Sequence, residues 1–293
     1  MHDYLGITLD YSEPGVVKLY MKDYIRKMLE EFKYKNELKD IKQVSTPAAD
    51  HLFEVNSSST KLENEKREEF HTTVAKALFL CKRTRPDLQP TVPFLCTRVQ
   101  STDEDDWKKL LRMLKYLEDT VDEELTLGAD KGDILLARYW PDASFAVHAD
   151  MKSHTGNIQS FGRGAANTIS QKQKLNTTSS TTAELVAAND TVPLALWTRN
   201  FLKEQGYESE TTIYQDNTSA MLLEKNGKES SSKRTRHINI RYFFIKDCID
   251  KNYLKVEYCP TDDMIGDYPS KPLQGKKFRK HKALIMGNKP IPT

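Results

Sequence analysis

The sequence predicts an α+β protein in two parts. A mostly helical segment comes first, and a mixed five-stranded sheet with helices follows in the order βββαβαβα. Within the first 130 residues, three stretches have apolar residues at helical spacing. From residue 134 onward, short alternating runs between glycine turns replace that pattern, which is typical of strands. The length of 293 residues suits about two domains, each able to bury its own core.

The composition excludes several classes of protein. Charged residues make up 29% and hydrophobic residues 38%, and no apolar run approaches the ~18 residues of a membrane span. The N-terminus "MHDYLGITLD" lacks the basic and apolar regions of a secretory signal. Four cysteines (Cys81, Cys96, Cys248, Cys259) are scattered without metal-binding spacing. We therefore expect reduced thiols in an intracellular protein without a membrane partner.

In the first part, residues 4–34 predict a strand, a turn at "SEPG", a second strand and a helix. Residues 44–69 are polar and without pattern, so we expect an exposed loop. Helices are expected over 70–82 and 102–120. Between them, Pro86, Pro90 and Pro93 interrupt any long helix.

The second part begins after "GADKGD", residues 128–133. Three antiparallel strands are expected in "ILLARYWPDASFAV", "GNIQSFGRG" and "ANTISQKQKL". A helix follows over about residues 179–206, and Pro193 should kink it. The remaining pattern predicts a strand at 211–216, helices at 217–226 and 238–252, a fifth strand at 253–260, and a short helix or turn near Asp267.

Glu184 lies near the start of the helix that begins at about residue 179, and it has two interpretations. With Thr181 it fits a capping box, in which the glutamate accepts a hydrogen bond from a free backbone N–H. Alternatively, it is a ligand in a larger group of acids. Asp142 follows the first strand's aromatic stretch, Asp216 ends the fourth strand, and Asp267 lies in the last short segment.

A sheet with its fourth strand beside its first would bring Asp142 and Asp216 together, with the Glu184 helix packed across them. Such a group of carboxylates is unfavourable without cations, and oxygen ligands suit Mg²⁺ or Mn²⁺. Two ions about 3.5–4 Å apart would stabilise the attacking and departing oxygens of a phosphodiester displacement. Gly266 and Pro269 flank Asp267, so we expect it to be the least rigidly held of the four acids.

The second part resembles the ribonuclease H domain of copia-type retrotransposon polyproteins. The matching residues are "PDASFAVHADMKSHTG", "SSTTAELVAAND", "YQDNTSAMLL", "SKRTRHINIRYFFIKD" and "PTDDMIGDYPSKPLQG". In that family, four catalytic, metal-binding acids lie at the positions of Asp142, Glu184, Asp216 and Asp267. The resemblance implies a ribonuclease H-like domain over residues 134–275.

The first part resembles the thumb and connection of the same polyproteins through "YLGITLDYSEPGVVKLYMKDYIRKMLEEF", "VSTP", "TRPDL" and "LLRMLKYLEDT". We assign a thumb/connection remnant to residues 1–130 and a basic C-terminal tail to residues 276–293. The polymerase motif Tyr-x-Asp-Asp is absent. The resemblance therefore implies a fragment without polymerase activity, for which the missing palm and fingers domain is a candidate partner.

Basic residues form three clusters, at 171–174, 233–236 and 276–282. Each alone is typical of solvated surface, but together they suit binding to phosphates. The nucleic-acid-binding candidates are Lys172, Lys174, Lys233, Arg234, Arg236 and His237. His237 either contacts a phosphate or braces its loop.

Several other residues have simple structural interpretations. We expect His148 and His154 in surface turns, Asp87 in a cap or ion pair, and Trp197 and Phe201 in the core together with Trp140. No aromatic platform for single-stranded nucleic acid is predicted.

The resemblance implies an endonuclease that cleaves the RNA strand of an RNA–DNA hybrid with two Mg²⁺ ions, in a cytoplasmic particle or the nucleus. One alternative is an inactive relic that binds nucleic acid or a protein partner, favoured by the missing palm motifs and Pro193. Another is a DNA-cutting transposase or integrase, because that fold carries similar acids.

Overall fold

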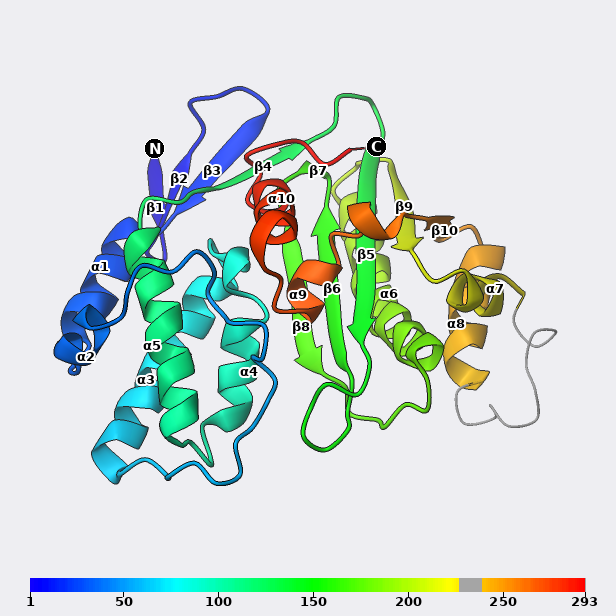
Figure 1. Ribbon diagram of the computed structural model, residues 1–293. Helices are drawn as coiled ribbons and strands as arrows, with labels where there is room; N and C mark the ends of the chain where they lie inside the picture. Colours follow the sequence, from blue (N-terminus) through cyan, green and yellow to red (C-terminus); the bar gives the residue numbers. More distant parts are fainter. Residues whose placement is uncertain (227–238, 293) are drawn as a thin grey trace.

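The computed structural model describes residues 1–226 and 239–292, and it confirms the α+β class. Two five-stranded sheets lie side by side, with helices against both (Figure 1). None of the helices in the described ranges is both long enough and apolar enough to cross a membrane.

The first sheet is antiparallel throughout and has the order β1-β2-β3-β4-β7. Its strands are β1 (His2–Tyr4), β2 (Ile7–Asp10), β3 (Val16–Tyr20), β4 (Leu125–Ala129) and β7 (Gly162–Arg163). The hairpin at "SEPG" is confirmed, and Gly15 adopts a φ of +83° there, a conformation that favours glycine. β7 comes from the second part of the chain, so this sheet contains strands from both parts.

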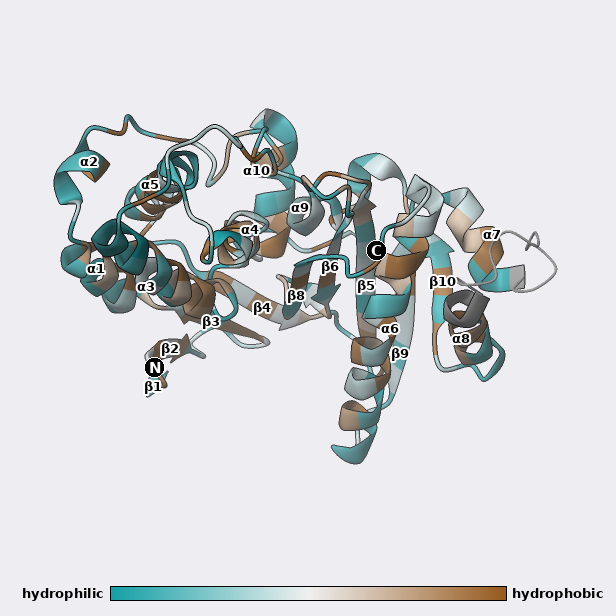
Figure 2. Ribbon diagram, turned by 90° about the horizontal axis from the view of Figure 1, so that it is seen from below, coloured by the Kyte–Doolittle hydropathy of each residue, from teal (hydrophilic) through white to brown (hydrophobic). Residues whose placement is uncertain are grey.

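The helices of the first part lie on one side of this sheet (Figure 2). They are α1 (Lys22–Glu31), α2 (Lys35–Lys39), α3 (Asn64–Cys81), η1 (Pro86–Leu88), α4 (Thr91–Arg98) and α5 (Glu104–Asp119). Pro93 lies in the first turn of α4, where a missing N–H costs little, so α4 forms despite it. The segment expected as an exposed loop is irregular, but it is not wholly exposed: Leu52 and Phe53 are buried.

The second sheet has the order β10-β9-β5-β6-β8. β5 (Leu135–Ser144), β6 (His154–Ser160) and β8 (Asn167–Lys172) are antiparallel, while β9 (Ser209–Gln215) is parallel to both β5 and β10 (Lys255–Tyr258). The expected neighbours, first and fourth strand, are therefore confirmed. α6 (Ser180–Glu204) packs against β5, β6 and β9, with α7 (Thr218–Asn226) and α8 (Asn239–Asp250) beside it.

On the opposite side of this sheet, α9 (Asp267–Ser270) packs against β5, β6 and β8, with α10 (Gly275–Ile285) beside it (Figure 2). The short helix η4 (Thr261–Asp263) precedes α9 in the chain. α10 lies where we expected a basic tail. Its Phe278 and Ile285 are buried, and the backbone N–H of Ile291 donates to Gly162 O at 2.8 Å. Residues 276–292 are thus packed structure and not a tail, because apolar residues alternate with the lysines that suggested solvent exposure.

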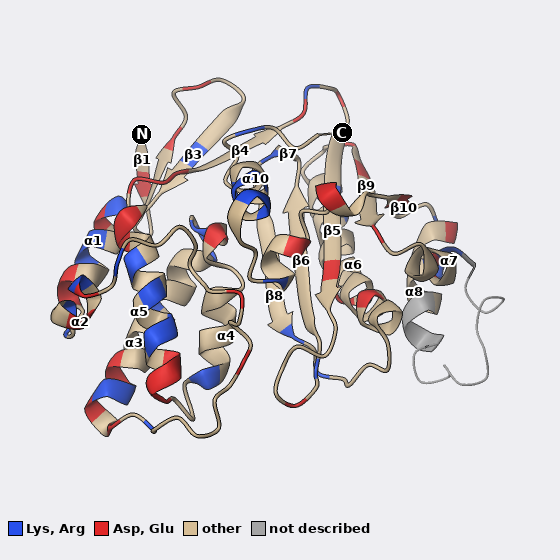
Figure 3. Ribbon diagram, viewed as in Figure 1, with Lys and Arg blue, Asp and Glu red and all other residues tan. Residues whose placement is uncertain are grey.

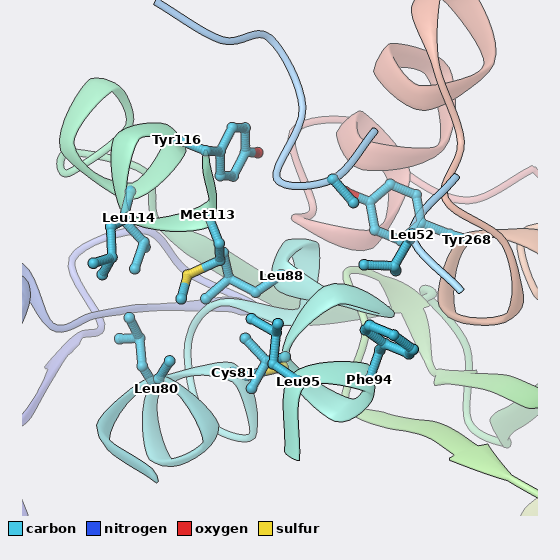
Figure 4. Packing of buried hydrophobic residues seen from close by; sticks show 14 of the residues in the cluster. Leu52, Leu80, Cys81, Leu88, Phe94, Leu95, Met113, Leu114, Tyr116 and Tyr268 are labelled. Atoms are coloured by element: carbon cyan, nitrogen blue, oxygen red, sulfur yellow. The ribbon is translucent and has the colours of Figure 1, made fainter. Parts of the chain in front are cut away.

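One hydrophobic core continues from the first part into the second. Figure 4 shows Tyr268 of α9 near Leu52 and Tyr116, among residues of α3, α4 and α5. Trp140 and Ile158 of the second sheet belong to the same cluster. A separate core lies between the second sheet and α6 and α8, around Tyr139, Val192, Ile213 and Ile245. The boundaries 1–130 and 134–275 remain predictions, and this shared core joins the two parts.

A buried polar network fixes α9 to the first part. Arg85 and Asp87 form a doubly hydrogen-bonded ion pair at 2.8 Å with both side chains fully buried, and Tyr116 Oη donates to Asp87 at 2.7 Å. Tyr268 Oη donates to Asp87 O at 2.9 Å. The ion-pair interpretation of Asp87 is confirmed. Burial alone would raise the pKa of Asp87, but Arg85 holds it below its ordinary value.

Two expectations about single side chains are wrong. His148 and His154 are buried, with their Nε2 and Nδ1 atoms 3.0 Å apart, because Phe53 of the irregular segment packs over both rings. Trp140 is in the core as expected, but Trp197 and Phe201 are 62% and 48% exposed and stack on each other. They lie on the face of α6 that points away from the sheet.

Candidate metal centre

Asp142 lies on β5, opposite Gly156 of β6. A Cβ at Gly156 would lie 2.6 Å from Ser270 N, and one at Gly266 would lie 2.2 Å from Trp140 O. The two glycines therefore let α9 lie directly against β5 and β6. As a result, Ser270 Oγ donates a hydrogen bond to Asp142 Oδ2.

Glu184 does not cap its helix. Ser179 is the N-cap of α6, and its hydroxyl accepts a hydrogen bond from the N–H of Thr182 at 3.2 Å. Glu184 lies further into the helix, and its Oε2 accepts a hydrogen bond from the backbone N–H of Ala143 at 3.1 Å. The capping-box interpretation with Thr181 is therefore wrong, because α6 begins two residues earlier. α6 continues through Pro193, which lies on its exposed side.

Asp216 follows the last residue of β9. Tyr139 of β5 pairs with Ile213 of β9, and Asp142 and Asp216 each lie three residues beyond that pair. The parallel register therefore brings the two carboxylates to the same end of neighbouring strands. Asp216 is only partly buried, so it is the most accessible of the four acids.

Three of the four predicted acids form a compact group. Asp142, Glu184 and Asp216 each offer one carboxylate oxygen, and these oxygens lie within 4.8 Å of one another. Figure 3 shows the acidic positions of β5 and α6 close together at this end of the sheet. Asp142 and Glu184 are buried. Hard oxygen donors in this arrangement fit a divalent cation such as Mg²⁺ or Mn²⁺, so the group could hold a metal ion.

The negatively charged carboxylates of this group repel one another. Burial raises the pKa of Asp142 to about 6, although Lys271 acts in the other direction. Burial also raises the pKa of Glu184, and the neighbouring Asp142 and Asp216 raise it further. Buried carboxylates that repel one another bind protons more tightly unless a cation neutralises them.

Asp267 lies beside this group, but two lysine side chains contact its carboxylate. It is the first residue of α9 and is 1% exposed. Lys271 Nζ contacts its Oδ1 and Lys277 Nζ contacts its Oδ2. Burial alone would raise the pKa of Asp267, but the two lysines hold it below its ordinary value. The short helix expected near Asp267 is confirmed as α9, and each oxygen of the Asp267 carboxylate has a lysine partner there.

The structure describes two of the six candidates for nucleic-acid binding. Lys172, on β8, pairs with Asp150 at 2.7 Å, and Lys174 is exposed just beyond the strand. Both line a hollow of about 290 Å³ beside Asn189 and Pro193 of α6. Lys233, Arg234, Arg236 and His237 lie outside the described residues.

Ser270, Lys271 and Lys277 are residues of this site that were not predicted from the sequence. One signal was available: Lys271 is four residues after Asp267, a spacing at which helical side chains meet. Lys277 carried no such signal, because its approach to Asp267 depends on how α10 packs against α9.

The chain is similar to parts of much longer proteins. It is 32% identical over 273 residues to the retrovirus-related Pol polyprotein from transposon TNT 1-94 of Nicotiana tabacum, a match over 91% of this chain and 20% of that protein. It is 30% identical over 282 residues to the corresponding polyprotein from transposon RE2 of Arabidopsis thaliana, over 95% of this chain and 18% of that protein.

More distantly, the chain is 24% identical over 285 residues to the transposon Ty1-H Gag-Pol polyprotein of Saccharomyces cerevisiae, over 95% of this chain and 16% of that protein. The chain thus spans a fifth or less of the length of these three relatives. No family model matches it.

Proposed function

Because the chain belongs to the retrovirus-related Pol polyproteins of copia-type transposons, we propose that it is a ribonuclease H that cuts the RNA strand of RNA–DNA hybrids. One observation carries the proposal. Carboxylates from β5, from α6 and from the end of β9 converge within 4.8 Å. The mixed five-stranded sheet beneath them fits a ribonuclease H-like fold.

In this proposal, Asp142, Glu184 and Asp216 hold Mg²⁺. When bound, the metal supplies an activated water and neutralises charge on the departing 3′ oxygen. The chain's own groups hold the ligands in place. The Ala143 N–H orients Glu184, and the Ser270 hydroxyl orients Asp142. Substrate approaches from the side of the partly exposed Asp216.

The hybrid would be recognised by its shape, its phosphates and its 2′-hydroxyls, and not by its base sequence. Lys172 is the last residue of β8 and Lys174 lies just beyond it; both line a hollow beside Asn189 and Pro193 of α6, where they would meet backbone phosphates. The remaining four-fifths of the relatives' length is not represented in this chain, so their further activities are not proposed for it.

The test is cleavage of a labelled RNA–DNA hybrid by the purified chain, with Mg²⁺ and then with EDTA. Glu184→Gln should abolish cleavage while the protein stays folded, because Gln still accepts the Ala143 hydrogen bond but lacks the negative charge that would help to hold the metal. Glu204→Gln, at the exposed end of the same helix, is the matched control and should cleave normally.

Two outcomes would count against the proposal. A Glu184→Gln variant that cuts at the normal rate would remove Glu184 from the site. Hybrid binding without Mg²⁺-dependent cleavage by the unaltered chain would instead support the inactive, nucleic-acid-binding alternative.

A further inference from the structure

A single ammonium group contacts two of the four acids. Lys271 Nζ pairs with Asp267 Oδ1 and lies 3.1 Å from Asp142 Oδ2 and 3.3 Å from Asp142 Oδ1. Both carboxylate side chains are only 1% exposed, whereas the Lys271 side chain is 39% exposed. The lysine therefore reaches in from the surface and places its charge between two buried anions.

This position follows from how α9 is held. Lys271 is one helical turn after Asp267, so their side chains meet. Gly156 and Gly266 allow α9 to approach β5 and β6, which brings the same ammonium to Asp142. Tyr268 fixes the helix from the other side through Asp87 O. The placement of Lys271 thus rests on packing and not on the ion pairs alone.

The cations are distributed unevenly over the four acids. Lys271 and Lys277 contact the Asp142–Asp267 side of the cluster. The other side, where Glu184 and Asp216 approach Asp142, is the side that offers three carboxylate oxygens to a metal. Four ionised carboxylates carry a charge of −4, and two ammonium groups reduce it to −2. One divalent ion neutralises that remainder.

We propose that Lys271 occupies the second cation position of this site, so that the resting protein binds one divalent ion, through Asp142, Glu184 and Asp216. This inference rests on the metal site of the proposed function. A second ion between Asp142 and Asp267 would have to displace the lysine. Because the Lys271 side chain is partly exposed, its long, rotatable stem lets the ammonium turn outward to an anion such as a substrate phosphate.

The test is to count bound Mn²⁺ on the full chain without nucleic acid, by titration calorimetry and by the paramagnetic signal of free Mn²⁺. The unaltered protein should bind one ion. Lys271→Met should bind two, with the second at least about tenfold tighter than any second ion on the unaltered chain, a change of about 1.4 kcal/mol. Lys271→Arg keeps the charge and should bind one.

Lys280→Met is the matched control, because Lys280 is on α10 but pairs with Asp263. It should bind one ion. If Lys271→Met does not remain folded, Lys271→Gln tests the same loss of charge while keeping a hydrogen-bonding group. Two equal ions on the unaltered chain, or one ion on both neutral Lys271 variants, would overturn the proposal.

The count also separates this proposal from the proposed function. A chain that gains a second ion on loss of Lys271 but never cuts a hybrid would support the lysine assignment and refute the ribonuclease. A chain that cuts hybrids but already binds two ions without nucleic acid would support the ribonuclease and refute the assignment of Lys271 to the second cation position.

Discussion

Replacing Asp142 by Asn should stabilise the metal-free protein, and the gain should depend on pH. Burial raises the pKa of Asp142 from an ordinary 3.8 to about 6. The folded protein therefore disfavours the ionised form, which is the form present in the unfolded chain above pH 4. The wild-type protein loses stability as pH rises through this range, and an Asn side chain does not.

The size of this change in stability follows from the pKa shift of Asp142. Roughly two pKa units at about 1.4 kcal/mol each give a penalty of about 3 kcal/mol once Asp142 is ionised in both states. Near pH 4 the penalty falls below about 1 kcal/mol, because Asp142 is protonated in the folded protein and partly protonated in the unfolded chain. Asn can still accept the Ser270 hydrogen bond, and Lys271 keeps its pair with Asp267, so the main change is the loss of the Asp142 charge.

The assay is urea unfolding in EDTA at pH 8 and pH 4, for both proteins. The Asn variant should be more stable by about 3 kcal/mol at pH 8 and nearly equal at pH 4. Added Mg²⁺ should stabilise the wild type and leave the variant unchanged. A variant that is less stable than the wild type at pH 8, or a stability difference that is the same at both pH values, would contradict this prediction.

Asp87→Asn provides the contrast to Asp142→Asn. Arg85 holds the pKa of Asp87 below its ordinary value, so this ion pair stabilises the protein above the unfolded pKa and is lost as pH falls. The same substitution should therefore destabilise the protein at pH 8. Breaking a buried pair costs about 3–5 kcal/mol.

Three other predictions concern the N-cap of α6, the basic cluster at 233–236 and the absent polymerase motif. Ser179→Ala removes the N-cap of α6, so it should lower the free energy of unfolding by about 1 kcal/mol in a melting experiment. The rate of hybrid cleavage should stay unchanged, and a lower rate would mean that the cap positions Glu184. Neutralising Lys233, Arg234 and Arg236 should reduce the slope of log affinity against log salt by about 2–3 in hybrid-binding titrations, and an unchanged slope would exclude these residues from the interface. The pure chain should not extend a primer, since the Tyr-x-Asp-Asp motif is absent; templated extension would contradict the assignment of residues 1–130.

Local patterns were sufficient to predict most of the second sheet. Alternating residues between glycine turns marked β5, β6 and β8, and parallel pairing of the first and fourth strands brought Asp142 and Asp216 together. The approach of Glu184 to them also followed, because α6 has to cross the sheet that it packs on. Periodicity and strand order are readable from the chain, so this part of the site was predictable.

The rest depended on contacts between distant segments. β7 is only two residues long, and it forms because it can pair with the edge strand β4. The burial of His148 and His154 required Phe53 from a segment about a hundred residues away. The pairing of Lys277 with Asp267 required the docking of α10. No local pattern encodes such contacts, so these features had to be seen in three dimensions.

The shared core also determines what cutting the chain would do. The link between β4 and β5 is exposed at residues 131–134, so a protease has access to it. Yet β7 completes the first sheet, and Tyr268 and Phe278 are buried in a core that both parts contribute to. A nick in this link would yield two chains that remain associated. Processing there would turn one polypeptide into a tightly held heterodimer, and neither half would be released as an independent protein.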